Sequence, residues 1–166
     1  MKTKSNLFRI LTSLATVLLL VSCTNDDDEI KLELWEMEIE QVKAATINYV
    51  DINVAMNEGR IDVSGYVPNM GHHYLRPQLA DGNFELLQPE FILYAPDENN
   101  IMQMVAIEYG IVPDDPNNPG NPPEGFTGSE DVWHFNEMIG MWTLHVWTIL
   151  DNPEGIFAAH NMAMGD

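Results

Sequence analysis

The sequence predicts an α+β protein in which an N-terminal amphipathic helix packs on a small, mainly antiparallel β-sheet. Three observations support this class. Apolar residues recur at helical spacing early in the chain, short alternating segments between turn residues follow, and 166 residues allow one modest domain. A hydrophobic share of 45% is enough to build a core. We therefore expect one globular domain over residues 30–160.

The N-terminus predicts export and lipid attachment. Residues 1–22 combine three basic residues with an apolar run over 10–21, which suits a signal peptide and is too short to span a bilayer comfortably. The run ends in Leu-Val-Ser-Cys, which resembles a bacterial lipobox, so Cys23 is the expected acceptor of two or three acyl chains. The alternative is an ordinary buried cysteine after a signal peptide. A single cysteine excludes an internal disulfide and a multi-cysteine metal site.

Residues 23–29 form the predicted tether, with four acidic residues directly after Thr24 and Asn25. This run resembles the export signal that directs lipoproteins of Bacteroidota to the cell surface. It also suits a solvated spacer that holds the domain away from anionic lipid. We expect a lipid anchor in the outer membrane with the domain at the cell surface, and a domain facing the periplasm is the alternative.

The charge balance excludes one class of partner. The chain has 7 basic and 26 acidic residues, and cleavage before Cys23 would leave four basic residues and a formal charge of −22. Affinity for nucleic acid comes mainly from basic residues that neutralise phosphates. We therefore expect no nucleic-acid partner.

Residues 30–58 predict the helix. Its apolar stripe follows a 3.6-residue period, acidic residues crowd its first turns, and Gly59 stands where a helix would stop. The alternation over residues 30–34 also allows a later start. The stripe comprises Trp35, Ile39, Val42, Thr46, Tyr49, Ile52 and Met56.

The remainder predicts strands and connections. A loop or strand entry is expected at residues 69–74, a proline- and asparagine-rich surface loop at 113–128, and a tail at 161–166. Ile156 and Phe157 should pack back on the domain. The expected strands cover residues 61–67, 90–95, 101–112, 133–135 and 140–150.

Alternation along the two longest strands places Glu108 and His145 together. Each has the parity opposite to the more apolar side of its strand, so in a shared sheet both would face one concavity. His72 and His73, from the segment after Pro68, could close it. The expected core sides hold Trp142, Leu144, Val146 and Leu150 in one strand and Val105, Ile107, Tyr109 and Ile111 in the other.

Two imidazoles and a carboxylate suit a divalent metal such as zinc, manganese, iron or copper. No pair of these residues has a tight ligand spacing, so two alternatives stay open. One is a buried polar network in which His145 hydrogen-bonds Glu108 or a backbone carbonyl. The other is a pocket for an organic ligand.

The chain carries Met-Gly-His-His-Tyr at 70–74, Glu-Tyr at 108–109, Leu-His-Val-Trp at 144–147 and Asn-Pro-Glu-Gly-Ile-Phe at 152–157. This series resembles an uncharacterised family of small secreted bacterial proteins and lipoproteins. The family carries Met-Gly-x-His-Tyr, Glu-Tyr and Leu-His-x-Trp followed by Asn-Pro-x-Gly-x-Phe, in that order, and the likeness covers most of residues 42–161. The resemblance selects His73 over His72, together with Glu108 and His145. His72, Tyr74 and Trp147 are secondary candidates.

The sequence thus favours a small binding module of the cell envelope, with a candidate metal site at His73, Glu108 and His145. The second hypothesis is a structural or interaction protein of the outer membrane, with these residues as a buried network. A metal-dependent enzyme of unknown substrate is the third, since no nucleophile is evident. Besides the membrane itself, candidate partners are an envelope protein, a glycan or a small molecule.

Overall fold

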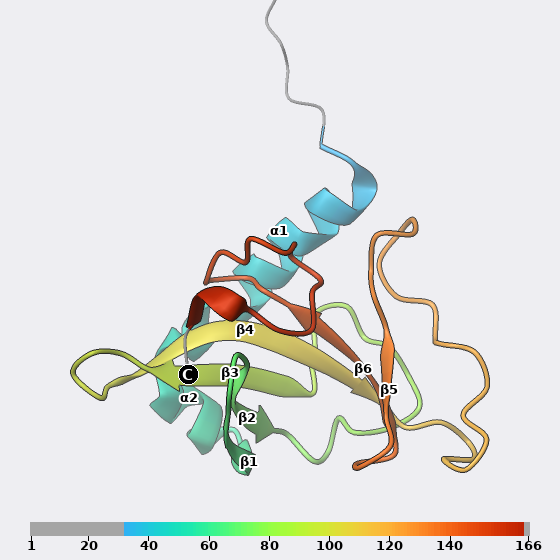
Figure 1. Cartoon of the computed structure of the whole chain (residues 1–166), viewed down its shortest axis with the longest axis horizontal. Coiled ribbons are helices and arrows are strands. Elements are labelled where there is room, and N and C mark those ends of the chain that lie inside the picture. The colour runs from blue at the N-terminus through green and yellow to red at the C-terminus, as the bar shows by residue number, and fades with distance from the viewer. Residues whose placement is uncertain (1–31, 165–166) are drawn as a thin grey trace, which may run out of the picture. The chain divides into compact units, whose positions relative to one another are not determined.

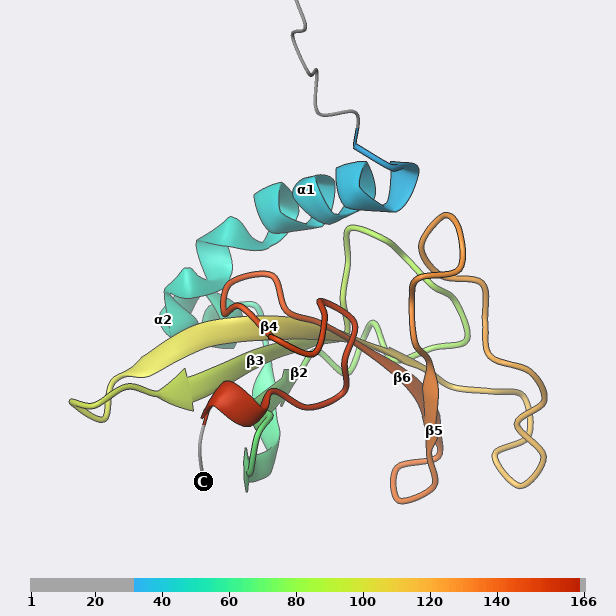
Figure 2. The same ribbon diagram turned by 45° about the horizontal axis from the view of Figure 1, so that its top comes forward.

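The computed structural model describes residues 32–164. It confirms an α+β fold that is mostly β, with helices first and then a curled sheet of six antiparallel strands. Figures 1 and 2 show the helices along one side of the long central strands, and the chain after the last strand folding back across them. The signal peptide, Cys23 and the acidic tether lie outside the described residues.

The predicted single helix is three consecutive helices. α1 (Leu34–Thr46) is followed by a 3₁₀ turn, η1 (Ile47–Val50), and by α2 (Ile52–Asn57). The division falls at Asp51, an extended residue whose side chain accepts a hydrogen bond from Asn53 N and so caps α2. The late start of α1 comes from a capping box between Glu33 and Glu36. No helix within residues 32–164 is long and apolar enough to cross a membrane.

The helical stripe packs on the sheet as expected over its first turns. Ile39, Val42 and Thr46 are buried. The prediction for Met56 is wrong, because this side chain is exposed and Ala55 is buried in its place. The helix is interrupted at Asp51, so a 3.6-residue period counted from α1 does not identify the buried residues of α2.

The sheet has the strand order β1-β2-β3-β4-β6-β5, with every neighbouring pair antiparallel. The segment around the two adjacent histidines, for which a loop was one expectation, is a complete strand. The strand ranges are β1 (Ile61–Val67), β2 (Gly71–Leu75), β3 (Phe91–Pro96), β4 (Met102–Ile111), β5 (His134–Asn136) and β6 (Met141–Val146).

Both faces of the central strands are buried. One face carries the larger cluster, in which Ile92, Ile107 and Leu144 pack with the helices. The other face carries a second cluster that includes Phe91, Leu93 and Trp147. The sequence predicted a single core face. This prediction was wrong, because segments before and after the central strands also pack on the second face.

The first half of β4 does not have the predicted parity, because the strand contains a β-bulge. Leu93 pairs with Ala106 and Tyr94 with Met104, so Val105 is an extra residue in the ladder. Met104 therefore joins the larger cluster, whereas Val105 joins the second. Beyond the bulge, Ile107 and Tyr109 have the predicted parity.

β6 ends at Val146, earlier than the predicted Leu150. The chain then turns, and Ile149 and Leu150 are largely exposed. Phe157 packs back into the larger cluster as predicted. Asn161, expected in a tail, is fully buried, where its backbone N–H donates to Asn69 O and its side chain donates to Asp151 O.

The loop predicted at residues 113–128 is hydrogen-bonded to α1 through one carboxylate. Glu38 accepts hydrogen bonds from the backbone N–H of Thr127 at 2.7 Å and from its hydroxyl at 2.6 Å. We expect Glu38→Gln to lower the free energy of unfolding by about 1 kcal/mol, since an amide cannot accept both bonds and the site is solvated. Glu40→Gln is the matched control, because Glu40 pairs only with Lys43 one turn away. Equal urea midpoints for the two variants would contradict this assignment.

Candidate functional site

Three strands of the sheet bring His73, Glu108 and His145 together, with β3 lying between the first two of these strands. His73 lies on β2, Glu108 on β4 and His145 on β6. Glu108 and His145 are direct partners in the antiparallel ladder, and their side chains therefore leave the sheet on the same face. His73 pairs with Leu93 on the intervening strand and reaches the same face. The predicted constellation is thus a real cluster.

The three side chains converge on one point. One ligand atom from each residue lies within 4.8 Å of those from the other two. The Nε2 atom of His73 is 3.6 Å from Oε2 of Glu108, and Nδ1 of His145 is 3.4 Å from Oε1. Each carboxylate oxygen therefore faces one imidazole. Both separations exceed the ordinary length of an N–H···O hydrogen bond.

The cluster is buried rather than exposed in a concavity. His73 is 8% exposed, and Glu108 and His145 are each 4% exposed. Burial raises the pKa of Glu108 to about 8, with an addition from the nearby Glu90 carboxylate and opposed by the Thr143 hydroxyl. Burial also lowers the pKa of His73 to about 4 and that of His145 to about 3. At neutral pH both imidazoles are uncharged.

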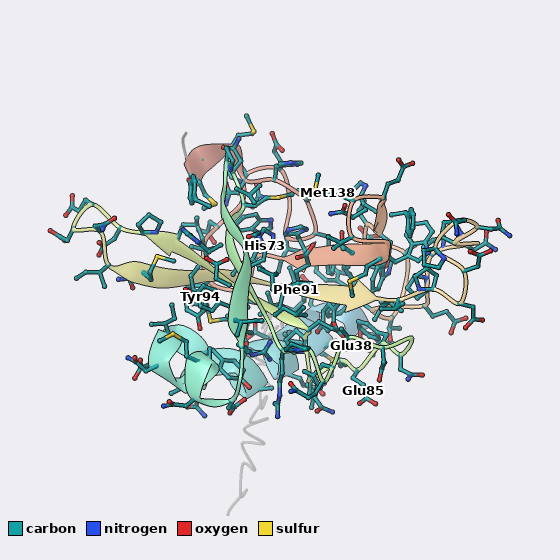
Figure 3. The ribbon with its side chains drawn as sticks, turned by 90° about the horizontal axis from the view of Figure 1, so that it is seen from below. Glu38, His73, Glu85, Phe91, Tyr94 and Met138 are labelled. Carbon is teal, nitrogen blue, oxygen red and sulfur yellow. The ribbon has the colours of Figure 1, made fainter. Side chains whose placement is uncertain are left out.

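The walls of the cluster are largely aromatic. The Phe91 ring meets His73 edge-on at 6.3 Å between centroids, and the two lie side by side near the middle of the sheet in Figure 3. The rings of His73 and His145 are perpendicular at 5.8 Å. Trp147 lies nearly parallel to His145 at 6.5 Å, and its indole N–H donates to Ala158 O. Such surroundings keep the effective dielectric low and strengthen any charge interaction inside.

One nitrogen of the cluster has no partner among residues 32–164. Nε2 of His145 is buried and makes no hydrogen bond within this part of the chain. A buried polar atom left unpaired costs about 1–3 kcal/mol. Such an atom is uncommon in a network that serves stability alone.

The secondary candidates lie in different places. His72 points away from the cluster and its Nδ1 contacts Asp62 Oδ2 at 2.8 Å. Tyr74 packs edge-on against Tyr94 in the larger core cluster at 5.1 Å. Only Trp147 borders the site. Alternation along β2 explains the division, since His73 faces the opposite side from both of its neighbours.

The sequence reasoning missed two polar neighbours of the site. Ser64 on β1 lies beside His73, with 3.0 Å between Oγ and Nδ1. Glu90 is a second buried carboxyl, and its Oε2 accepts a hydrogen bond from Gly110 N. Burial raises the pKa of Glu90 to about 7. No local pattern marks either residue, because both contacts depend on pairing between strands.

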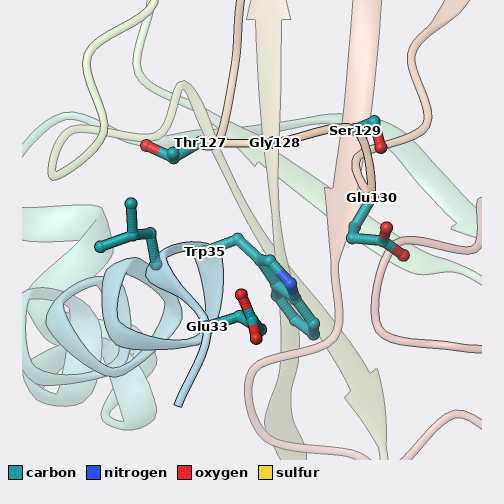
Figure 4. Close-up of a pocket in the computed structure, with 7 residues that line it drawn as sticks. Glu33, Trp35, Thr127, Gly128, Ser129 and Glu130 are labelled. Carbon is teal, nitrogen blue, oxygen red and sulfur yellow. The ribbon is translucent and has the colours of Figure 1, made fainter. Parts of the chain in front are cut away.

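Two shallow hollows lie elsewhere on the surface. The first, of about 290 Å³, lies between the start of α1 and the loop at residues 127–130, and Trp35 is among the residues that line it (Figure 4). The second, of about 300 Å³, is lined by Lys43, by residues 147–149 and 151–153, and by Ile156. Neither includes the three converging residues.

Comparison of the chain with models of known protein families, with curated protein sequences and with solved structures finds no match.

Proposed function

We propose that this chain is a lipid-anchored protein of the cell envelope whose domain binds one divalent transition-metal ion through His73, Glu108 and His145. The observation that carries the proposal is the convergence of two imidazoles and one carboxylate, all buried, with their ligand atoms within 4.8 Å of one another. These are common protein ligands for zinc, and they also suit iron, manganese and copper.

The spacing of the donor atoms supports an ion between them. Ligands at about 2.0–2.1 Å from a tetrahedral zinc lie about 3.3–3.4 Å from one another, whereas hydrogen-bonded pairs lie at about 2.7–3.2 Å. The two observed N···O separations, 3.4 and 3.6 Å, end on different oxygens of Glu108 and are both longer than hydrogen bonds, so an ion among the three side chains would draw them together. Two imidazoles and a carboxylate are a common ligand set for zinc, which is therefore the first ion to test.

The protonation states also favour a cation. Metal ligands must present lone pairs, so a histidine ligand must be neutral, and burial already keeps both imidazoles neutral at pH 7. Glu108 would lose its proton when the ion binds, and the ion would then supply the positive charge that this buried carboxylate lacks. Three protein ligands leave a tetrahedral ion one further position for water or a small ligand.

The alternative is a buried polar network without metal. It accounts for the burial of the three residues. It does not account for the long N···O separations. The envelope location is supported by the N-terminal sequence, namely the lipobox-like segment before Cys23 and the acidic run after it.

Elemental analysis of the full chain, purified in mild detergent without tag or chelator, tests the proposal. We expect close to one equivalent of zinc or another divalent transition metal for each chain. After removal of the ion with a chelator, added zinc should raise the melting temperature. A protein that contains no metal, and whose melting temperature does not respond to zinc, manganese, iron or copper, would exclude the site.

A further inference from the structure

Ser64 occupies an unusual position on β1. Most of this strand is exposed, and its ladder with β2 is interrupted between Asp62 and Tyr66. Within the interruption, Gly65 has a φ of +64°, which favours glycine. The Asp62 carboxylate accepts hydrogen bonds from the backbone N–H groups of Ser64 and Gly65, at 3.2 and 3.0 Å. This local turn directs the Ser64 hydroxyl toward the ring of His73.

The hydrogen bonds of the Ser64 hydroxyl determine where His73 carries its proton. A hydroxyl has one proton to donate and two lone pairs. The proton goes to Gly65 O at 2.7 Å, because a carbonyl can only accept. One lone pair accepts from the backbone N–H of His73 at 3.0 Å. The contact of 3.0 Å to Nδ1 must then be a hydrogen bond that the imidazole N–H donates.

A neutral His73 ring with its proton on Nδ1 has a bare lone pair on Nε2. This is the atom that lies 3.6 Å from Oε2 of Glu108, inside the cluster. Two lone pairs that face each other in a buried site repel unless a proton or a cation lies between them. Metal-bound histidines commonly use their second nitrogen in this way, donating its proton to an oxygen acceptor that fixes the ring.

We infer that Ser64 is a positioning residue for the metal centre: it holds His73 in the Nδ1–H form and aims Nε2 at the ion. This inference rests on the proposed function, which it deepens by adding an outer partner to the ligand set. Ser64 would contact no metal itself. This role also explains the irregular turn in β1. In a regular ladder the strand would not bend, and Asp62 would not hydrogen-bond the backbone of Ser64 and Gly65.

The tautomer of His73 can be measured without any metal. In the metal-free full chain at pH 7.5, long-range ¹H–¹⁵N NMR spectra should show a protonated Nδ1 and a bare Nε2 for His73. In Ser64→Ala this pattern should be lost or become mixed, and zinc affinity should fall about 10- to 100-fold. Ser64→Thr keeps a hydroxyl and should restore both properties. Ser129→Ala, the same change at an exposed loop serine, is the matched control and should alter neither.

The two readouts separate this inference from the proposed function. A parent protein with the proton on Nε2 of His73, or a Ser64→Ala variant with unchanged tautomer and zinc affinity, would overturn the role of Ser64. A tautomer that depends on Ser64 in a protein that takes up no zinc would uphold the assignment of the proton but exclude the metal centre.

Discussion

Replacement of Glu108 with glutamine should abolish metal binding while leaving the metal-free protein at least as stable as the parent at pH 8. Glutamine has nearly the same shape, and its amide can donate to the imidazole nitrogens as a protonated carboxyl would. The substitution removes the one anionic residue of the three proposed ligands. Loss of a hydrogen-bond partner of a ligand lowers metal affinity by up to roughly 100-fold, and loss of a ligand itself should lower zinc affinity by more than that. Isothermal titration with zinc and urea unfolding measure the two effects.

This variant distinguishes a metal ligand from a member of a structural network. In a network that only stabilises the fold, Glu108→Gln would cost about 1–3 kcal/mol through a disturbed buried hydrogen bond and would leave metal content unaffected. Glu90→Gln is the matched control, because Glu90 is an equally buried carboxyl outside the three-residue cluster. It should retain zinc binding. Loss of zinc in both variants would point to general disruption of the sheet.

The metal-free protein should be most stable between about pH 5 and 6.5 and should lose stability on both sides. The pKa of Glu90 is raised to about 7 and that of Glu108 to about 8. The folded state therefore holds these protons more tightly than the unfolded state does. The stability that the two protons contribute is complete below about pH 4.5 and is lost as the pH rises through 7 and 8.

The two buried histidines act on the acidic side with the opposite sign. The pKa of His73 is lowered to about 4 and that of His145 to about 3, so the folded state favours their neutral forms. Their contribution is complete above about pH 6.5 and is lost as the pH falls through 4 and 3. As the pH falls, these imidazoles take up protons in the unfolded chain before they do so in the folded chain. Acid therefore stabilises the unfolded state relative to the fold.

The loss on the alkaline side is large enough to measure. Between pH 6 and 8, we expect a loss of about 1 kcal/mol from Glu90 and about 2 kcal/mol from Glu108, since each pH unit below a folded-state pKa contributes about 1.4 kcal/mol. Urea titrations in a chelator at several pH values give the profile. Glu108→Gln should remove most of the alkaline decline. An identical profile in the variant and the parent would show that Glu108 ionises normally in the folded chain.

The sequence was sufficient to bring the ligands of the candidate site together. Period-two alternation put Glu108 and His145 on one face because both lie in regular stretches, after the bulge in β4 and before the end of β6. His73 was selected by resemblance to a motif, and the structure places it at the same point. Local pattern is reliable where the ladder is regular, since each residue then reverses the face of the one before it.

The parts that could not be predicted depend on contacts between distant segments. The extra residue at Val105 has no signature in sequence, and it reversed the expected faces in the first half of β4. The second face is buried because Leu75 and Ala80 on one side, and Ile156 and Met164 from the chain after β6, pack against it. Ser64 meets His73 only through the irregular pairing of β1 with β2. Each of these features is set by tertiary packing rather than by propensity.

The bulge in β4 also divides the protein by its tolerance to change. The ladder on one side of Val105 leads to the hairpin tip around Asn99 and Asn100, whereas Glu108 stands on the other side. A length change at that tip would be absorbed where the register is already interrupted, and the ligand half of the strand would keep its phase. A single residue inserted between Val105 and Glu108 would instead turn the carboxylate to the helix-covered face. A peptide label added at the tip should therefore leave Glu108 on its present face, whereas one extra residue between Val105 and Glu108 should remove its carboxylate from the cluster.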